Sequence, residues 1–556
     1  MKRPMLRALV TFFVLSWCSV ATVVQAKDEL LIGITQYPAT LHPNIESMLA
    51  KTYVLAMVMR PFTIYGHDWE LACMLCTELP TLENGGAVRE KTPKGKEGMA
   101  VTYTIHPQAT WGDGTPVSTR DVTFTWEVGR NPESGVVSQE LYRRILKIDV
   151  VDDKTFTIHN DRIEFDYPAL SDFILLPEHL ERKVFESNPA EYRNRTLFDR
   201  EPANPGLYFG PYRVTDVGRG SHIVLERNPT WWGNEPQFKR IVVKAIENTA
   251  ALEANLLSGE VDLIAGELGL SLDQALTFEK RHGDRFNIIY KPGLIYEHID
   301  LNLDNPILQD LRVRKALVLG IDREAISHQL FANKQPVADT SVNPLDWVYD
   351  ERVPKYAFDA KQAGQLLDEA GWSTRKKNIR HNSRGERLSL EIMTTAGNRS
   401  RELVEQVLQS QWRELGVDVR IRNEPARVFF GETVTQRKFT AMAMYAWISA
   451  PENVPRTTLH SEEIPSSENA WSGQNYTGYS NPAMDELLDA IEVQLDRDKR
   501  KTMWSELQRM YATDLPVIPL YFRANAYMLP KWLHGVRPTG HLFPTTLWVE
   551  EWNGSP

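Results

Sequence analysis

The sequence predicts a mixed α/β protein built from several lobes. Strand and helix signals alternate irregularly along the chain, which argues against a repeat array. Gly259 and Gly416 end two predicted helices directly before apolar strand signals. A chain of 556 residues is also longer than a single hydrophobic core usually supports. Separate lobes, each with strands and helices, are therefore expected.

The N-terminus predicts export. Basic residues are followed by an apolar run over residues 8–24 and a small-residue cleavage site, so residues 1–26 are expected to be a signal peptide. A retained membrane anchor is disfavoured because polar residues interrupt the run. A lipoprotein signal at Cys18 is disfavoured because Trp17 is bulky where a small residue is needed. The mature chain would then start at Lys27.

Charge limits the partners of the mature chain. Loss of three basic residues and no acids with the signal peptide would move the formal net charge from −10 to −13. Such a balance disfavours nucleic acid and anionic membrane surfaces as partners. No later segment is apolar for long enough to span a bilayer.

The mature chain has only two cysteines, Cys73 and Cys76. In an exported protein they are expected to form a local structural disulfide or to remain idle thiols. A redox C-x-x-C is disfavoured because no thioredoxin-like βαβ pattern surrounds it. A zinc site would need two more ligands, and His67 is the only nearby candidate.

The first third of the mature chain predicts strands, a turn and a helix. Residues 29–43 begin as an alternating strand and are then interrupted by prolines, and residues 101–105 alternate again. Asp113-Gly114 predicts a turn. Ser118 and Asp121 form a capping-box pattern at the start of a helix.

The rest of the chain continues the mixed pattern. Residues 374–387 are basic and polar and predict an exposed loop. The other predicted elements are, in order, a hairpin over 147–160, two strands and a proline-aromatic loop over 204–233, a strand-helix-strand unit over 240–264, a helix over 311–331 and a helix followed by a strand over 400–423.

A search for catalytic motifs favours a binding protein over an enzyme. The sequence has no G-x-S-x-G elbow, no H-E-x-x-H pair and no P-loop. The G-R-G-S-H-I segment at Gly218 lacks the third glycine of a dinucleotide-binding loop. We therefore expect no catalytic residue, no metal ligand set and no cofactor.

Several segments carry recognisable motifs in a fixed order: TWGDGTPVSTRDVTFTWE (110–127), FGPYRV (209–214), LERNPTWWG (225–233), LRVRKALVLGIDREAI (311–326), YTGYSNPAMDELLD (476–489) and DLPVIPLYFR (514–523). Together they resemble the motifs of the periplasmic solute-binding proteins of peptide and nickel ABC importers, extracellular solute-binding family 5. The resemblance spans Ile32 to Gly540, nearly the whole mature chain.

The resemblance implies a bilobed, three-domain periplasmic-binding-protein (Venus flytrap) fold of the large, cluster C type. A ligand would be enclosed between the lobes, and the closed form would dock on a membrane ABC permease. The protein would be a periplasmic monomer without cofactor. The domains expected on this basis are a discontinuous lobe-1 core of residues 27–52, 207–290 and 517–556, an extra lobe-1 domain of residues 53–206, and a lobe-2 domain of residues 291–516.

The stretch YAWISAPENVP, residues 445–455, predicts a loop after a strand, with a backbone restricted by its two prolines. In peptide-binding relatives the matching loop carries W-x-x-D, whose Asp pairs with the α-ammonium of the peptide. Here Trp447 takes the place of the Trp, and Ala450 stands where the Asp would be. An alanine cannot pair with an ammonium, whose burial without a partner is costly.

Two interpretations of this departure remain open. Glu452 could reach the same ammonium through a shifted loop. Alternatively, the cargo has no free α-ammonium and is a modified peptide, an opine-like conjugate or a sugar-derived compound. Arg399 and Arg401 lie near where relatives place an arginine for the ligand carboxylate, or else they are solvated charges that flank a helix. The expected ligand-binding residues are Tyr37, Arg399, Arg401, Tyr445, Trp447, Ser449, Ala450 and Glu452.

Three functions are compatible with these features. The first is capture of a peptide or peptide-like solute for an ABC importer. The second is the same transport role with an oligosaccharide, an opine-like conjugate or a metal chelate as cargo. The third is an exported enzyme or chaperone-like factor. Ligand-induced closure without a product separates the first two from the third.

Overall fold

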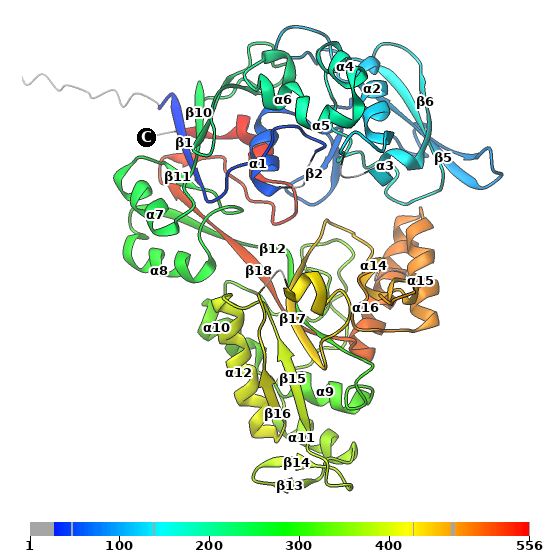
Figure 1. Cartoon of the computed structure of the whole chain (residues 1–556), viewed down its shortest axis with the longest axis vertical. Coiled ribbons are helices and arrows are strands. Elements are labelled where there is room, and N and C mark those ends of the chain that lie inside the picture. Colours follow the sequence, from blue (N-terminus) through cyan, green and yellow to red (C-terminus); the bar gives the residue numbers. More distant parts are fainter. Residues whose placement is uncertain (1–26, 46–47, 137–138, 426–427, 469–472, 555–556) are drawn as a thin grey trace, which may run out of the picture.

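The protein has two lobes joined by long strands (Figure 1). Strands β12 (Phe286–Leu301) and β18 (Val517–Pro530) run from the upper lobe into the lower lobe. The bilobed α/β fold predicted from the sequence is therefore confirmed. The computed structural model describes residues 27–45, 48–136, 139–425, 428–468 and 473–554. The predicted signal peptide lies outside the described residues.

One mixed sheet of ten strands passes through both lobes. Its other strands are β1 (Glu29–Ile34), β8 (Tyr212–Gly218), β9 (His222–Arg227), β10 (Arg240–Ala245), β11 (Leu263–Ile264), β15 (Ser389–Met393), β16 (Asp418–Ile421) and β17 (Met442–Ile448). The strand order is β16-β15-β17-β12-β18-β11-β1-β10-β9-β8. The antiparallel β12–β18 pair shifts register between Pro292 and Tyr296 and between Glu297 and His298. This irregularity falls where the strands pass from one lobe to the other.

The upper lobe carries a second sheet, with the order β4-β5-β7-β6. Its strands are β4 (Ala87–Lys91), β5 (Glu97–Thr104), β6 (Ile145–Val150) and β7 (Thr155–Asn160). The β6–β7 hairpin confirms the one predicted over residues 147–160. Helix α2 (Thr119–Arg130) begins at the predicted capping box, in which the backbone N–H of Ser118 donates to Asp121 at 2.8 Å.

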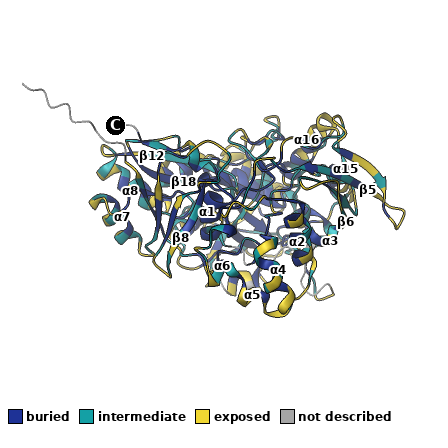
Figure 2. Ribbon diagram, turned by 90° about the horizontal axis from the view of Figure 1, so that it is seen from above, coloured by how far each residue is buried: buried dark blue, intermediate teal, exposed yellow. Residues whose placement is uncertain are grey.

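The remaining helices of the upper lobe surround these sheets (Figure 1). They are α1 (Leu49–Val58), α3 (Gln139–Arg144), α4 (Glu178–Ser187), α5 (Tyr192–Arg195), α6 (Leu197–Arg200), α7 (Thr249–Ser258) and α8 (Leu272–His282). Figure 2 shows buried residues concentrated in the interior, with exposed residues on outer elements such as α4 and α5. Within the described residues, no helix is both long and apolar enough to cross a bilayer.

The lower lobe packs helices around β15, β16 and β17. These helices are α9 (Leu311–Leu319), α10 (Arg323–Phe331), α11 (Ala360–Glu369), α12 (Arg399–Leu415), α14 (Arg456–Leu459), α15 (Pro482–Val493) and α16 (Arg497–Asp514). As predicted, α12 ends at Gly416, whose φ of 93° is left-handed. The fully buried Trp412 donates from its indole N–H to the carbonyl of Leu317 at 2.9 Å, which fixes α12 against α9.

The prediction of a loop over residues 374–387 was wrong for part of this segment. Strands β13 (Thr374–Lys376) and β14 (Ile379–His381) form a hairpin whose turn residues have positive φ values. Arg380 is buried and donates to the carbonyl of Trp372 at 2.8 Å and to Asp368 at 2.5 Å. A basic residue that finds buried acceptors can anchor a hairpin, and this pairing is not visible in local composition.

We propose the domain division predicted from the sequence for this structure. Residues 53–206 include the separate four-stranded sheet, which supports an extra domain in the upper lobe. Strands β1, β8, β9, β10 and β11 lie beside β18 in the same sheet, which supports a discontinuous core of residues 27–52, 207–290 and 517–556. Residues 291–516 would form the lower lobe.

Cys73 and Cys76 form a disulfide, with Cα atoms 5.1 Å apart. Cys73 ends β3 (Leu71–Cys73), which pairs with β2 (Thr63–Tyr65). Chain-entropy arguments assign so short a loop a stabilisation of about 2 kcal/mol or less. We expect the Cys73→Ser/Cys76→Ser variant to lower the free energy of unfolding by no more than about 2 kcal/mol, measured by urea titration. A loss above about 4 kcal/mol would assign the bridge a larger structural role.

Candidate functional site

Residues at the end of β17 and in the loop that follows it line three cavities. Ala450 lines a cavity of about 130 Å³, here called the loop cavity. Ile448 lines both the loop cavity and an upper cavity of about 430 Å³, whose other lining residues lie within residues 43–174 and 542–547. Glu452 lines a third cavity of about 740 Å³, here called the ionic cavity, between residues 65–168 and residues 347–500. The loop therefore borders space between the two lobes.

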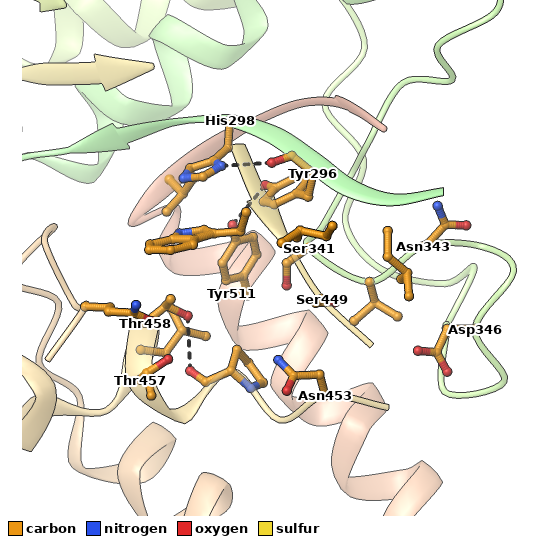
Figure 3. Close-up of a pocket in the computed structure, with 18 of the residues that line it drawn as sticks. Tyr296, His298, Ser341, Asn343, Asp346, Ser449, Asn453, Thr457, Thr458 and Tyr511 are labelled. Atoms are coloured by element: carbon orange, nitrogen blue, oxygen red, sulfur yellow. Dashed lines mark hydrogen bonds between the residues drawn. The ribbon is translucent and has the colours of Figure 1, made fainter. Parts of the chain in front are cut away.

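The loop cavity has aromatic and polar walls (Figure 3). Its aromatic lining comprises Tyr296, Trp447, Trp504 and Tyr511. Hydroxyl and amide groups come from Ser341, Asn343, Ser449, Asn453, Thr457, Thr458 and Gln474. Aromatic surface with a few converging polar groups is typical of sites for small organic ligands.

The predicted residues Trp447, Ser449 and Ala450 all line this cavity. The Trp447 ring stacks on Tyr476, with ring centroids 6.1 Å apart. The hydroxyl of Ser449 donates to the carbonyl of Ala450 at 3.3 Å. Ile448, which lies between Trp447 and Ser449 in the sequence, is 55% exposed, so an apolar side chain faces the space between the lobes.

Tyr445 does not line the loop cavity but contacts two residues that do. It is 1% exposed, and its hydroxyl donates to the carboxylate of Asp300 on β12. Burial, together with the Asp300 charge, raises the pKa of Tyr445 well above its usual value. The ring also packs edge-on against His298, with centroids 4.6 Å apart. Tyr445 therefore helps to fix the side chains of Asp300 and His298, both of which line the cavity.

Glu452 is held by protein partners on the side of the ionic cavity. Its carboxylate pairs with Arg500 of α16 and accepts from the indole N–H of Trp347 at 3.0 Å. Its backbone N–H donates to Asp346 at 2.7 Å, and its φ of 53° is left-handed. An ammonium bound by Glu452 would have to compete with Arg500. The predicted role of Glu452 toward a ligand remains a prediction.

Arg401 lies in a separate cavity of about 360 Å³ beside the passage between the lobes, here called the hinge cavity. Its guanidinium pairs with Glu297 of β12 at 2.5 Å, and the residue is 8% exposed. Arg523, which also lines this cavity, lies 3.9 Å from the same carboxylate. One glutamate is thus shared by two arginines. Glu267 also lines this cavity, so its charged side chains balance formally, and a carboxylate ligand would compete with Glu297 for the two guanidinium groups.

The two other predicted ligand contacts, Arg399 and Tyr37, do not line these cavities. Arg399 is exposed at the first residue of α12, and it does not line the hinge cavity as Arg401 does. Tyr37 lies near Gly220 and Arg219, at the β8–β9 hairpin. Burial raises the pKa of its hydroxyl. Tyr37 lines none of the four cavities named above.

Sequence reasoning missed His298, Asp300 and Asp346, which line the loop cavity. A signal for the first two was present, because polar residues at spacing two in a buried strand share one face. Asp346 comes from a loop, and no local pattern marks it. Burial raises its pKa to about 6, although the backbone N–H groups of Glu452 and Val348 donate to it.

The described part of the chain holds no group of three or more His, Cys, Asp or Glu side chains that could bind a metal ion.

The family profile described as "Bacterial extracellular solute-binding proteins, family 5 Middle" matches residues 90–464. The chain belongs to this family. Family 5 proteins are the non-enzymatic substrate-binding components of ABC importers, and the resemblance noted in the sequence is confirmed. The family profile identifies the type of transport protein but does not specify its cargo.

Family 5 relatives match over most of their length. The oligopeptide-binding protein AppA of Bacillus subtilis is 25% identical over 94% of this chain and 92% of its own. The periplasmic oligopeptide-binding protein OppA of Escherichia coli is 24% identical over 79% of each chain.

Solved family 5 structures share the fold. The oligopeptide-binding protein of Thermus thermophilus, complexed with a pentapeptide, has a TM-score of 0.69 and 28% identity over 95% of this chain and 96% of its own. NikZ of Campylobacter jejuni, complexed with Ni(L-His), has a TM-score of 0.71 and 22% identity over 95% and 99%. At that identity NikZ supports the fold alone.

Proposed function

We propose that this chain is the exported, periplasmic substrate-binding component of an ABC importer, and that its cargo is a peptide or peptide-like solute. The cargo is enclosed between the lobes and delivered to a membrane permease. The observation that carries the proposal is that residues at the end of β17 and in the loop after it line the loop, upper and ionic cavities. The oligopeptide-binding relatives over nearly the full chain support it.

The proposed contacts follow from the cavities. Trp447, Ser449 and Ala450 would contact the cargo in the loop cavity, with Tyr445 behind them. Arg401 with Arg523 would meet a carboxylate in the hinge cavity. Closure would be favoured because a cargo that touches both lobes binds the closed state better than the open one.

A non-peptide cargo is the second candidate, and Ala450 favours it. The position that holds an acid in peptide-binding relatives has no charge here, and Glu452 is paired with Arg500. A sugar-derived compound or an opine-like conjugate could use the aromatic walls of the loop cavity without an ammonium partner.

Native mass spectrometry of the full chain, exported and purified from its own periplasm, tests the proposal. A ligand that stabilises the closed state should survive gentle purification. We expect a released peptide mass, and we expect added pentapeptide to reduce the radius of gyration of the emptied protein in X-ray scattering. A released sugar or conjugate would select the second candidate. Conversion of the compound into a product would overturn the transport role.

The same spectra test two further expectations. The mass of the denatured chain shows whether the signal peptide is cleaved before Lys27, and the mass of the intact complex shows whether the protein is a monomer.

A further inference from the structure

The loop cavity differs in charge from the other cavities described above. Its lining includes Asp300 and Asp346 but no lysine and no arginine. By contrast, the hinge cavity contains Arg401 and Arg523, the ionic cavity contains Arg497 and Arg500, and the upper cavity contains Lys51. An anionic group in the loop cavity would therefore meet carboxylates without a compensating side-chain cation.

His298 brings an unpaired acceptor to the same cavity. The residue is 1% exposed, and its Nδ1 lies 3.2 Å from the carbonyl oxygen of Tyr296. A carbonyl can only accept, so Nδ1 must carry the proton. In the neutral ring, Nε2 is then a lone-pair acceptor. Within the described residues Nε2 has no hydrogen-bond partner.

Asp300 lies beside this nitrogen. Nε2 of His298 and Oδ1 of Asp300 are 3.3 Å apart, a distance compatible with an ion pair, yet the direction of the ring nitrogen does not give a hydrogen bond. Asp300 accepts from the Tyr445 hydroxyl, and the described residues show no lysine or arginine paired with it. Two buried acceptors thus face each other, an arrangement that a bound donor would complete.

We propose that the loop cavity binds a cationic nitrogen of the cargo, which donates to Nε2 of His298 and to the carboxylate of Asp300. This inference rests on the proposed function and names the chemistry that the cargo must offer. The nitrogen is either the α-ammonium of a peptide or the ammonium or guanidinium of a basic side chain. The acid that is missing at Ala450 would then be supplied by Asp300 on β12 and not by the loop itself.

The opposite end of the cavity is a weaker candidate. Asp346 lies across the cavity from His298 in Figure 3. Its two oxygens already accept from the backbone N–H groups of Glu452 and Val348, at 2.7 and 3.3 Å. The carboxylate therefore holds the loop, whereas the acceptor on His298 is free for a ligand. Asp346 provides a matched control, since it has the same charge in the same cavity.

Calorimetric titration with alanine pentapeptides tests the proposal on the ligand-free full chain. One arm compares free with N-acetylated pentaalanine. The other uses N-acetylated peptides that carry lysine or norleucine at each position in turn. We expect at least one cationic peptide to bind about tenfold or more tightly than its neutral partner, a typical effect for a buried charge-assisted contact. The arm that shows the difference identifies the α-ammonium or the side chain as the source.

Asp300→Asn should lower the affinity for the cationic peptides to that of their neutral partners and so abolish this preference. The amide can still accept from Tyr445, and its NH₂ can donate to Nε2, so the fold should be retained. Asp346→Asn should keep the preference. If Asp300→Asn does not fold, His298→Phe removes the acceptor while keeping an aromatic ring against Tyr296.

Three outcomes would overturn the inference. Equal binding of cationic and neutral peptides by the wild-type chain would overturn the cation site and leave peptide capture intact. Loss of the preference in Asp346→Asn but not in Asp300→Asn would move the cation to the other end of the cavity. Failure of every pentapeptide to bind would overturn the proposed peptide function, and the cation site with it.

Discussion

Replacing Arg500 by methionine is expected to lower the free energy of unfolding by about 3–5 kcal/mol, the usual cost of breaking a buried ion pair from one side. Arg500 is 6% exposed and Glu452 is 7% exposed, so the variant leaves a buried carboxylate without its cation. The guanidinium also lies 4.6 Å above the ring of Phe165, and this contact is lost as well. Urea unfolding followed by tryptophan fluorescence measures the change.

Arg497→Met is the matched control for this substitution. Arg497 begins α16 and pairs with Glu70 at 2.6 Å, but both side chains are 50% exposed. An exposed pair of this kind contributes between zero and about 1 kcal/mol. The double variant Glu452→Gln/Arg500→Met should recover much of the loss, because no buried charge is left unpaired. A cost below about 1 kcal/mol for Arg500→Met would contradict the buried pair.

The same pair connects stability to the site. Glu452 contacts Arg500 through its side chain and Asp346 through its backbone, so it anchors the loop that carries Ala450. Loss of the anchor should weaken cargo binding even where the chain stays folded. If Glu452 instead contacted the ligand directly, Glu452→Gln would weaken the binding only of cargo that carries a free ammonium.

The architecture could be predicted because its signals are local. The capping box at Ser118, the β6–β7 hairpin and the end of α12 at Gly416 each depend on residues close in sequence. Apolar alternation marks strands wherever one face is buried. The bilobed arrangement itself came from the ordered family motifs, since no local rule brings β12 and β18 together over more than 200 residues.

The site was only partly predictable because its decisive contacts are distant in sequence. The loop and its residues Trp447, Ser449 and Ala450 were identified from position alone. The partner of Glu452 lies 48 residues away on another helix. Likewise Arg401 meets Glu297 across 104 residues. Such ion pairs decide which charges remain available to a ligand, and they emerge only from tertiary packing.

Glu405→Gln is expected to raise the free energy of unfolding by about 3 kcal/mol at pH 8, the cost of ionising a carboxyl whose pKa is raised by burial to about 7. Glu405 is fully buried on α12, and its Oε2 accepts from Asn423 at 2.8 Å while Oε1 has no partner among the described residues. Burial raises its pKa to about 7. Glutamine has a similar shape and carries no charge.

The pH dependence fixes the sign of this effect. In the unfolded chain the carboxyl loses its proton near pH 4.3, whereas in the folded chain it keeps the proton to about pH 7. Between these values the folded state binds more protons, so wild-type stability falls as pH rises, and the full penalty applies above pH 7. The gain from Glu405→Gln should therefore be small near pH 4 and largest at pH 8.

Glu414→Gln on the same helix separates this effect from a general change of charge. Glu414 is exposed, so the variant should differ from wild type by less than about 0.5 kcal/mol at either pH. A gain from Glu405→Gln that is equal at pH 4 and pH 8 would mean that packing, and not ionisation, limits stability there. A loss at pH 8 would mean that the carboxylate charge is compensated, with Arg401, one turn earlier on α12, as the nearest candidate cation.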